Sequence, residues 1–344
     1  MECNGGVHNV TQDDVLLIAQ PHTSSETIMT TVVLPLIAVL GVLSNGAFIF
    51  VVSRLPHMRT PTNYYLVSLA VADIMDVCAG VGDKLLLFLS SPISPDEAGY
   101  GGPAGCMLAN FITNTSYFTT LFLITLVSLE KFYAVCHPMR VARGQAGRRA
   151  VRAITCAGMV AVLLSLTFLP TCGVKIEFCL QWPQGSDHAS SPSTVITYSP
   201  PYDWMSTYTR LCRTFPFFAT LVANFVFYIR IIRALGRQVA AMESHGQANV
   251  GAGPHARNMV ARMLVVTGTA YFVLLAPLEV TQLCFLIGYF RGHVYVLDEH
   301  QASILFQVVR ILSYINSASN PFIYGVINRK YREAYKLALR CKQQ

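Results

Sequence analysis

Seven long apolar stretches dominate the sequence, and they restrict the chain to a bundle of membrane-spanning helices. They cover about 29–53, 63–89, 105–136, 150–171, 208–234, 258–287 and 303–326. Each stretch reaches the roughly 20 residues that a helix needs to cross a bilayer. Only 12% of the residues are charged, well below the roughly 25% of soluble domains. Because the stretches are apolar on most faces, a soluble helical protein is a poor alternative. We predict an all-α fold, a seven-transmembrane helix bundle.

The positions of lysine and arginine predict the orientation of this bundle. Nineteen of the 25 basic residues lie in the connections on one side, at the end of the third stretch or after the seventh, and cytoplasmic segments are rich in Lys and Arg. We therefore expect an extracellular tail over 1–28, a transmembrane domain over 29–326 and a cytoplasmic segment over 327–344. The expected location is the plasma membrane.

The segment after Tyr324 alternates apolar and basic residues at helical spacing, which predicts a short amphipathic helix on the inner leaflet. The net charge of +7 fits anionic lipid headgroups as a partner of this face. We do not expect nucleic acid as a partner, because no basic groove with interleaved aromatic residues is evident.

Polar side chains within the apolar stretches mark the inside of the bundle, because an unpaired polar group is costly in hydrocarbon. Asp73 lies in the cytoplasmic half of the second stretch and requires a proton, a cation or polar partners. Four further residues could supply oxygen atoms at that depth: Asn45, Thr120, Asn316 and Asn320. The sequence leaves two interpretations open, a Na⁺ or proton site and a plain hydrogen-bonded aspartate.

The seventh stretch carries Arg310 near its outer end and closes on Asn-Pro-Phe-Ile-Tyr324. Pro321 removes one backbone donor, which predicts either a hydrated hinge or a static kink. Arg310 is among the costliest residues to place in a membrane. It either faces an outer water-filled cavity, where it would attract an anionic or carbonyl-rich ligand, or pairs internally with a carboxylate such as Asp83 or Glu279.

Cysteines and a sequon predict covalent modification on the outer side. Cys106 opens the third stretch, and Cys172 and Cys179 follow the fourth; thiol pairs outside the cell tend to oxidise. We expect a disulfide between Cys106 and Cys179, because Cys172 lies close to the end of the fourth helix. The sequence Asn9-Val10-Thr11 is a glycosylation sequon in the outer tail.

The chain resembles rhodopsin-class G-protein-coupled receptors over nearly its whole length. The resemblance rests on residues that occur in the family's order, namely Asn45, Leu69-Ala70-Val71-Ala72-Asp73, Cys106, Pro216, Pro277 and Asn320-Pro321-Phe322-Ile323-Tyr324. Within this class, Met58 to Asp73 and Arg310 to Pro321 are most similar to thyrotropin-releasing hormone receptors and related peptide receptors.

This resemblance implies a cell-surface receptor that binds a small ligand, such as a peptide, and transmits agonist binding to a heterotrimeric G protein. It implies an outer pocket with ligand contacts from Arg310, Asn114, Tyr117, Phe118, Leu278 and Gln282. It also implies that Glu130, Lys131 and Tyr324 take part in coupling to the G protein.

Departures from the family pattern leave an alternative open. Glu130-Lys131-Phe132 replaces the family's Asp/Glu-Arg-Tyr, and lysine lacks the planar fork of five donors that arginine offers. Leu275 stands where the family has a tryptophan, Gly158 replaces another tryptophan, and Asn224 replaces a tyrosine. The alternative is a ligand-binding membrane protein with weak or no coupling, a decoy or a heteromer partner.

An enzyme is not expected, because the His-Glu-x-x-His, Gly-x-Ser-x-Gly and P-loop patterns are absent. A transporter is disfavoured, since the two halves show no internal repeat and no paired broken helices. We expect no cofactor other than the possible Na⁺.

Overall fold

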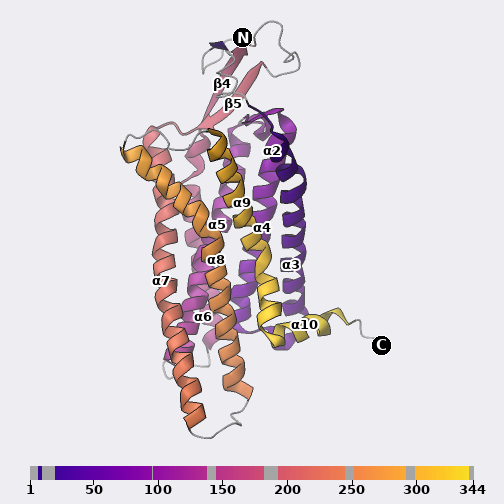
Figure 1. Ribbon diagram of the computed structural model, residues 1–344, viewed down its shortest axis with the longest axis vertical. Coiled ribbons are helices and arrows are strands. Elements are labelled where there is room, and N and C mark those ends of the chain that lie inside the picture. Colours follow the sequence, from indigo (N-terminus) through magenta and orange to yellow (C-terminus); the bar gives the residue numbers. More distant parts are fainter. Residues whose placement is uncertain are drawn as a thin grey trace.

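The computed structural model describes residues 7–9, 20–94, 96–137, 145–181, 193–244, 252–291 and 299–340. Seven long helices run side by side, with β-strands and the N-terminus at one end and a short helix at the other (Figure 1). This arrangement agrees with the predicted seven-helix bundle, and each predicted stretch lies within or nearly within one helix.

The first spanning helix is a continuous run of α2 (Ser24–Ile28), a π-helical turn (Met29–Val33) and α3 (Leu34–Arg54). The others are α4 (Pro61–Ser90), α5 (Pro103–Cys136), α6 (Ala146–Leu166), α7 (Asp203–Ser244), α8 (Ala252–Arg291) and α9 (Glu299–Ile327). By length and apolarity, six helices of the described chain could cross a membrane. The seventh, α9, is more polar, and it packs between α3, α4 and α8.

Local sequence signals set where helices begin. Thr60 precedes α4 and its hydroxyl accepts a hydrogen bond from the Asn63 amide at 3.3 Å, while Pro61 fills the first helical position. At the other end of the chain, the Asn328 side chain accepts from the Lys330 amide at 3.0 Å and starts α10 (Arg329–Leu339). Such capping satisfies amides that have no partner within the helix.

The helix α10 buries one face and exposes the other, as the alternating sequence predicts. Tyr331, Ala334 and Ala338 are buried, and Leu337 and Leu339 are exposed. The Tyr331 hydroxyl donates to the Asn63 side chain at 2.5 Å, which fastens α10 to the start of α4. Figure 1 shows α10 crossing the inner end of the bundle rather than continuing α9.

The sides of the bundle, which would face lipid, are apolar, as expected for helices in a membrane. Phe215, Val222 and Phe225 on α7 are among the large side chains that remain more than 60% exposed. Polar side chains are instead enclosed, and Asn45, Asp73 and several others are almost fully buried. This inversion relative to a soluble protein follows from the cost of placing polar groups in hydrocarbon.

Two small sheets cover the outer end of the bundle. In the first, β4 (Val174–Gln181) pairs antiparallel with β5 (Thr194–Ser199) and parallel with β1 (Val7–Asn9). In the second, β2 (Gln20–Pro21) pairs with β3 (Ile93–Ser94). Three short helical turns, Pro56–Met58, Ala98–Tyr100 and Leu169–Cys172, complete the connections. These strands were not predicted from the sequence. Asn9 of the sequon ends β1, at the outer end of the bundle.

The predicted pairing of Cys106 with Cys179 is wrong. The structure joins Cys106 to Cys172, with a Cα–Cα distance of 5.9 Å. Cys172 ends the turn directly after α6 and lies beside the start of α5, whereas β4 leads away from the bundle (Figure 1). Cys179 lies in that strand opposite Val7, too far along it to reach Cys106, and is itself disulfide-bonded. Proximity to the fourth helix therefore favoured Cys172 instead of excluding it.

Candidate functional site

A cavity of about 520 Å³ opens between the outer halves of α4, α5, α7, α8 and α9. Its volume lies within the roughly 300–1,000 Å³ of small-ligand pockets. Its lining contains four of the six predicted ligand-contacting residues, Asn114, Leu278, Gln282 and Arg310. Residues far apart in the sequence therefore converge on one space, which could enclose a small molecule or the end of a peptide.

The remaining two predicted contacts lie outside the lining. Tyr117 is buried beneath the cavity, and the guanidinium of Arg213 lies over its ring at 4.3 Å from the centroid. Phe118 is fully buried, with ring centroids 5.7 Å from Phe168 and 6.2 Å from Phe122. Tyr117 thus supports the floor of the cavity, whereas Phe118 packs in the hydrophobic core behind Phe168.

Arg310 makes no ion pair within the described part of the chain, although it lies on the cavity wall. Of its two predicted internal partners, Asp83 pairs with Lys84 at 3.1 Å and accepts from the Tyr100 hydroxyl at 2.5 Å. The other, Glu279, pairs with Arg213. Because both carboxylates are engaged elsewhere, the geometry favours the cavity-facing interpretation of Arg310.

Two further arginines of the cavity, Arg210 and Arg213 on α7, were not predicted as ligand contacts. They are three residues apart, so they share one face of the helix. That spacing near the outer end of an apolar stretch was the available signal, because two cations on one face of a spanning helix must turn towards protein or water. With Arg310, they place three guanidinium groups on the cavity wall.

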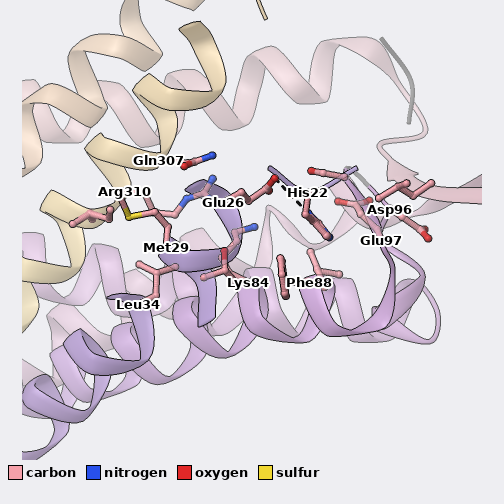
Figure 2. A pocket seen from close by; sticks show the side chains of 15 residues that line it. His22, Glu26, Met29, Leu34, Lys84, Phe88, Asp96, Glu97, Gln307 and Arg310 are labelled. Atoms are coloured by element: carbon pink, nitrogen blue, oxygen red, sulfur yellow. Dashed lines mark ion pairs between the residues drawn. The ribbon is translucent and has the colours of Figure 1, made fainter. Parts of the chain in front are cut away.

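A smaller cavity of about 240 Å³ adjoins the first, and Figure 2 shows its lining. It lies between the N-terminal segment, α4 and α9, and it shares Lys84, Glu97 and Arg310 with the larger cavity. Apolar side chains such as Met29 and Phe88 form part of its wall. The two cavities therefore meet at a charged junction.

His22 holds the N-terminal segment against this smaller cavity. Its Nδ1 lies 3.4 Å from Glu26, a contact that Figure 2 marks, and its Nε2 lies 3.0 Å from the Ser91 carbonyl oxygen. Its ring packs on Phe88 with centroids 4.4 Å apart. The contact with Glu26 raises the pKa of His22 above its usual 6.5, because the adjacent carboxylate favours the charged imidazolium.

Deeper in the bundle, Asp73 belongs to a buried polar network. Asn320 donates to Asp73 Oδ2 at 2.8 Å, and Asn45 donates to the Ser317 carbonyl at 2.9 Å. The Ser317 hydroxyl donates to Asp76 Oδ2 at 3.1 Å. Asp76 also lines the outer cavity. The network therefore extends from the cavity floor to the middle of the bundle.

Four buried oxygens of this network have no hydrogen-bond partner among the residues that the structure describes, namely Asp73 Oδ1, Asn45 Oδ1, Asn316 Oδ1 and Asn320 Oδ1. Thr120 is buried on α5, but none of the network's hydrogen bonds includes it. Within the described residues, no three His, Cys, Asp or Glu side chains group as metal ligands. Unpaired hard oxygens around one or two carboxylates suit a weakly held cation or water rather than a transition metal.

At the inner end, Lys131 is largely buried instead of reaching into solvent. Its Nζ lies 3.3 Å from Glu130 Oε1 and also contacts the Thr62 hydroxyl on α4. Tyr324 is buried between aromatic rings, with centroids 5.2 Å from Phe48. Lys131 and Tyr324 thus lie inside the packed inner end, where movement of the helices would be needed to expose them, whereas the Glu130 side chain is already 31% exposed.

Comparison with known proteins places this architecture in a family. The model of the seven-transmembrane receptors of the rhodopsin family matches residues 44–324. Neuromedin-U receptor 2 of Mus musculus is 28% identical over 95% of this chain and 79% of its own length. Somatostatin receptor type 5 of Bos taurus is 25% identical over 93% of this chain and 78% of its own length. Pyrokinin-1 receptor of Drosophila melanogaster is 26% identical over 91% of this chain and 80% of its own length.

Among solved structures, squid rhodopsin is similar to the fold. The TM-score is 0.68 at 19% identity, covering 94% of this chain and 89% of that one. The family match covers most of the chain and includes every spanning helix at least in part. The chain therefore belongs to the rhodopsin family of seven-transmembrane receptors, and it is a multi-pass membrane receptor rather than an enzyme.

Proposed function

We propose that the chain is a cell-surface receptor for a peptide and transmits agonist binding to a heterotrimeric G protein. The observation that carries this proposal is the open cavity of about 520 Å³ with Arg310 on its wall, where it has no ion-pair partner among the described residues. An unpaired guanidinium within a membrane protein is costly unless water or a ligand satisfies it. The three relatives named above are peptide receptors by name, which supports a peptide as the ligand class.

The adjoining smaller cavity supports a chain-like ligand. A ligand held at Arg310 would lie at the junction of both cavities, because Arg310 lines each of them. The excess of basic residues at the α10 end supports an extracellular N-terminus and a cytoplasmic C-terminus in the plasma membrane. On that inner side we assign coupling to Glu130, Lys131 and Tyr324.

We also propose that the Asp73 network binds Na⁺ as an allosteric ion. The unpaired oxygens of Asp73, Asn45, Asn316 and Asn320 fit a hard cation. Thr120 is included in this proposal only because the sequence places it at about the depth of Asp73 in the membrane. A bound cation would supply positive charge to the buried carboxylate, and displacing it would change the packing of α4 against α9.

A ligand screen tests the receptor proposal. The expressed chain is exposed to neuromedin U, somatostatin, pyrokinin and a pool of short amidated peptides, and guanine-nucleotide exchange is measured on a panel of G proteins. We expect at least one peptide to stimulate exchange. Binding without exchange on any G protein would instead support the binding-only alternative.

Arg310→Ala then tests the site. We expect the potency of the active peptide to fall about 100-fold or more, since a charge-assisted contact is lost in a site of low dielectric. Arg291→Ala is the matched control, because Arg291 is an exposed arginine at the outer end of α8 and lines neither cavity. Unchanged potency of Arg310→Ala at equal surface expression would remove Arg310 from the ligand site.

A further inference from the structure

Three arginines line the large cavity, and within the described part of the chain only Arg213 has a carboxylate partner there. Its Nε lies 3.4 Å from Glu279 Oε1, and its Nη1 lies 3.4 Å from Asn114 Oδ1. Both distances are long for hydrogen bonds to a charged group, which are usually about 2.7–2.9 Å. Nη2 donates to no group within the described part of the chain. The guanidinium is thus held loosely and keeps free donor capacity.

The two partners of this ion pair differ in how they meet the cavity. The Arg213 side chain is 29% exposed and lines the cavity, whereas the Glu279 side chain is 0% exposed and does not. Glu279 Oε2 makes no hydrogen bond among the described residues. A group that enters the cavity can therefore reach Arg213 on its open side, while Glu279 contacts it from behind.

The surroundings hold Arg213 in place without the carboxylate. The centroid of the Tyr117 ring lies 4.3 Å from the guanidinium carbon of Arg213. Asn114 Oδ1 accepts a hydrogen bond from Arg213 Nη1, and the Asn114 side-chain amide donates to the Asn110 carbonyl at 2.8 Å. A cation over an aromatic face is attracted by the ring's quadrupole. Loss or weakening of the Glu279 contact would leave Arg213 stacked and pointing into the cavity.

We propose that Arg213 is an anion-binding group of the ligand site and that Glu279 is the internal counter-ion with which a ligand carboxylate competes. This inference rests on the proposed receptor function and assigns its ligand a carboxylate, from an acidic side chain or a free C-terminus. The fork of Arg213 can bind such a carboxylate through Nη1 and Nη2. Arg210, one turn away on the same helix, and Arg310 across the cavity add two further guanidinium groups to its wall, beside the carboxylates of Asp76, Asp83 and Glu97.

Competition has a consequence that distinguishes it from a merely structural ion pair. If Glu279 stabilises only the fold, removing its charge leaves carboxylate affinity unchanged or weakens it by loosening the site. If Glu279 competes with the ligand, removing its charge strengthens the binding of carboxylates, because Arg213 then has no counter-ion. Neutral ligands of the same shape gain nothing.

The test uses N-acetylphenylalanine as the carboxylate probe and N-acetylphenylalaninamide as its neutral match. Thermal unfolding of the purified, detergent-solubilised chain is measured against probe concentration up to about 20 mM, since a bound probe raises the melting temperature by mass action. We expect Glu279→Gln to bind the acid about tenfold more tightly than the unsubstituted chain does, with the amide unaffected. Glu177→Gln is the matched control, because it also removes a carboxylate that pairs with a cation, Lys175, but one that lies on β4 and lines neither cavity. We expect less than a threefold change for it.

Arg213→Gln alone would leave Glu279 buried without a cation and destabilise the fold, so the double variant Arg213→Gln/Glu279→Gln removes both charges. We expect it to fold and to lose the preference for the acid over the amide. The proposal is overturned if Glu279→Gln fails to strengthen acid binding, if the double variant keeps the preference, or if no variant binds the acid. The assay contains no G protein, so a failure of the chain to stimulate exchange would be seen separately.

Discussion

A single added methyl group at Gly268 should destabilise the inner half of the bundle. Gly268 lies on α8, where an added Cβ would overlap the Tyr228 hydroxyl of α7 and approach its Cζ to 2.7 Å and its Cε2 to 3.3 Å. Tyr228 is buried, and its hydroxyl accepts a hydrogen bond from Ser128 of α5 at 3.0 Å. Gly268 thus permits α8 to approach a contact that links α5 and α7.

Three contributions set the expected loss of stability, two of them destabilising and one stabilising. Overpacking a filled core costs about 1–3 kcal/mol, and displacing the Tyr228 hydroxyl from Ser128 loses a hydrogen bond of about 1 kcal/mol. Replacing glycine by alanine within a helix returns ~1 kcal/mol of helix propensity. The same propensity gain applies to Gly158→Ala on α6, where an added Cβ meets nothing within 4 Å. Relative to that control, Gly268→Ala should be destabilised by about 2–4 kcal/mol.

Thermal unfolding of both variants in detergent measures the difference, which we expect to be about 3–6 °C in melting temperature. Adding Tyr228→Phe to Gly268→Ala removes the overlapping oxygen and should recover part of the loss, although Cζ remains at 2.7 Å. Equal melting temperatures for Gly268→Ala and Gly158→Ala would refute the reasoning, because they would show that α8 does not approach Tyr228 so closely.

Three shorter predictions concern charge. Lys131→Arg should raise basal or agonist-driven nucleotide exchange, because arginine supplies more donors than the buried lysine; unchanged exchange would show that this position does not limit coupling. Asp73→Asn should abolish any effect of Na⁺ on agonist affinity, measured against choline chloride, and an effect that persists would exclude Asp73 as an ion ligand. The raised pKa of His22 means that its contribution to stability is present below pH 6.5 and is lost as the pH rises through the folded-state value. Amide exchange over Ser24–Ile28, corrected for intrinsic rates, should therefore show less protection at pH 8 than at pH 6, and His22→Gln should remove this difference.

The spanning helices could be predicted from the sequence because crossing a bilayer imposes a length and an apolarity that few other segments satisfy. Asp73 and Asn320 could likewise be expected to point into the bundle, since polar residues in such helices must face inward. Their mutual hydrogen bond follows from this requirement. The amphipathic α10 was predictable for the same reason, because its periodicity identifies the buried face.

The features that sequence reasoning missed depend on how separate segments meet. The ion pair of Arg213 with Glu279 requires the rotation of α7 relative to α8, which the apolar pattern of either helix leaves undefined. The hairpin β4–β5 is short and lies outside the membrane, where no bilayer constraint selects its structure. The choice of Cys172 over Cys179 depended on the path of that hairpin away from the bundle.

The parallel pairing of β1 with β4 has a practical consequence for anyone who labels this receptor. A reporter attached ahead of Val7 would extend from the edge of the sheet that stands at the outer end of the bundle. Its bulk would crowd β4, so ligand affinities measured with such a fusion would include the effect of this crowding. A reporter placed behind α10 avoids this sheet altogether, and the two fusions should give different ligand affinities.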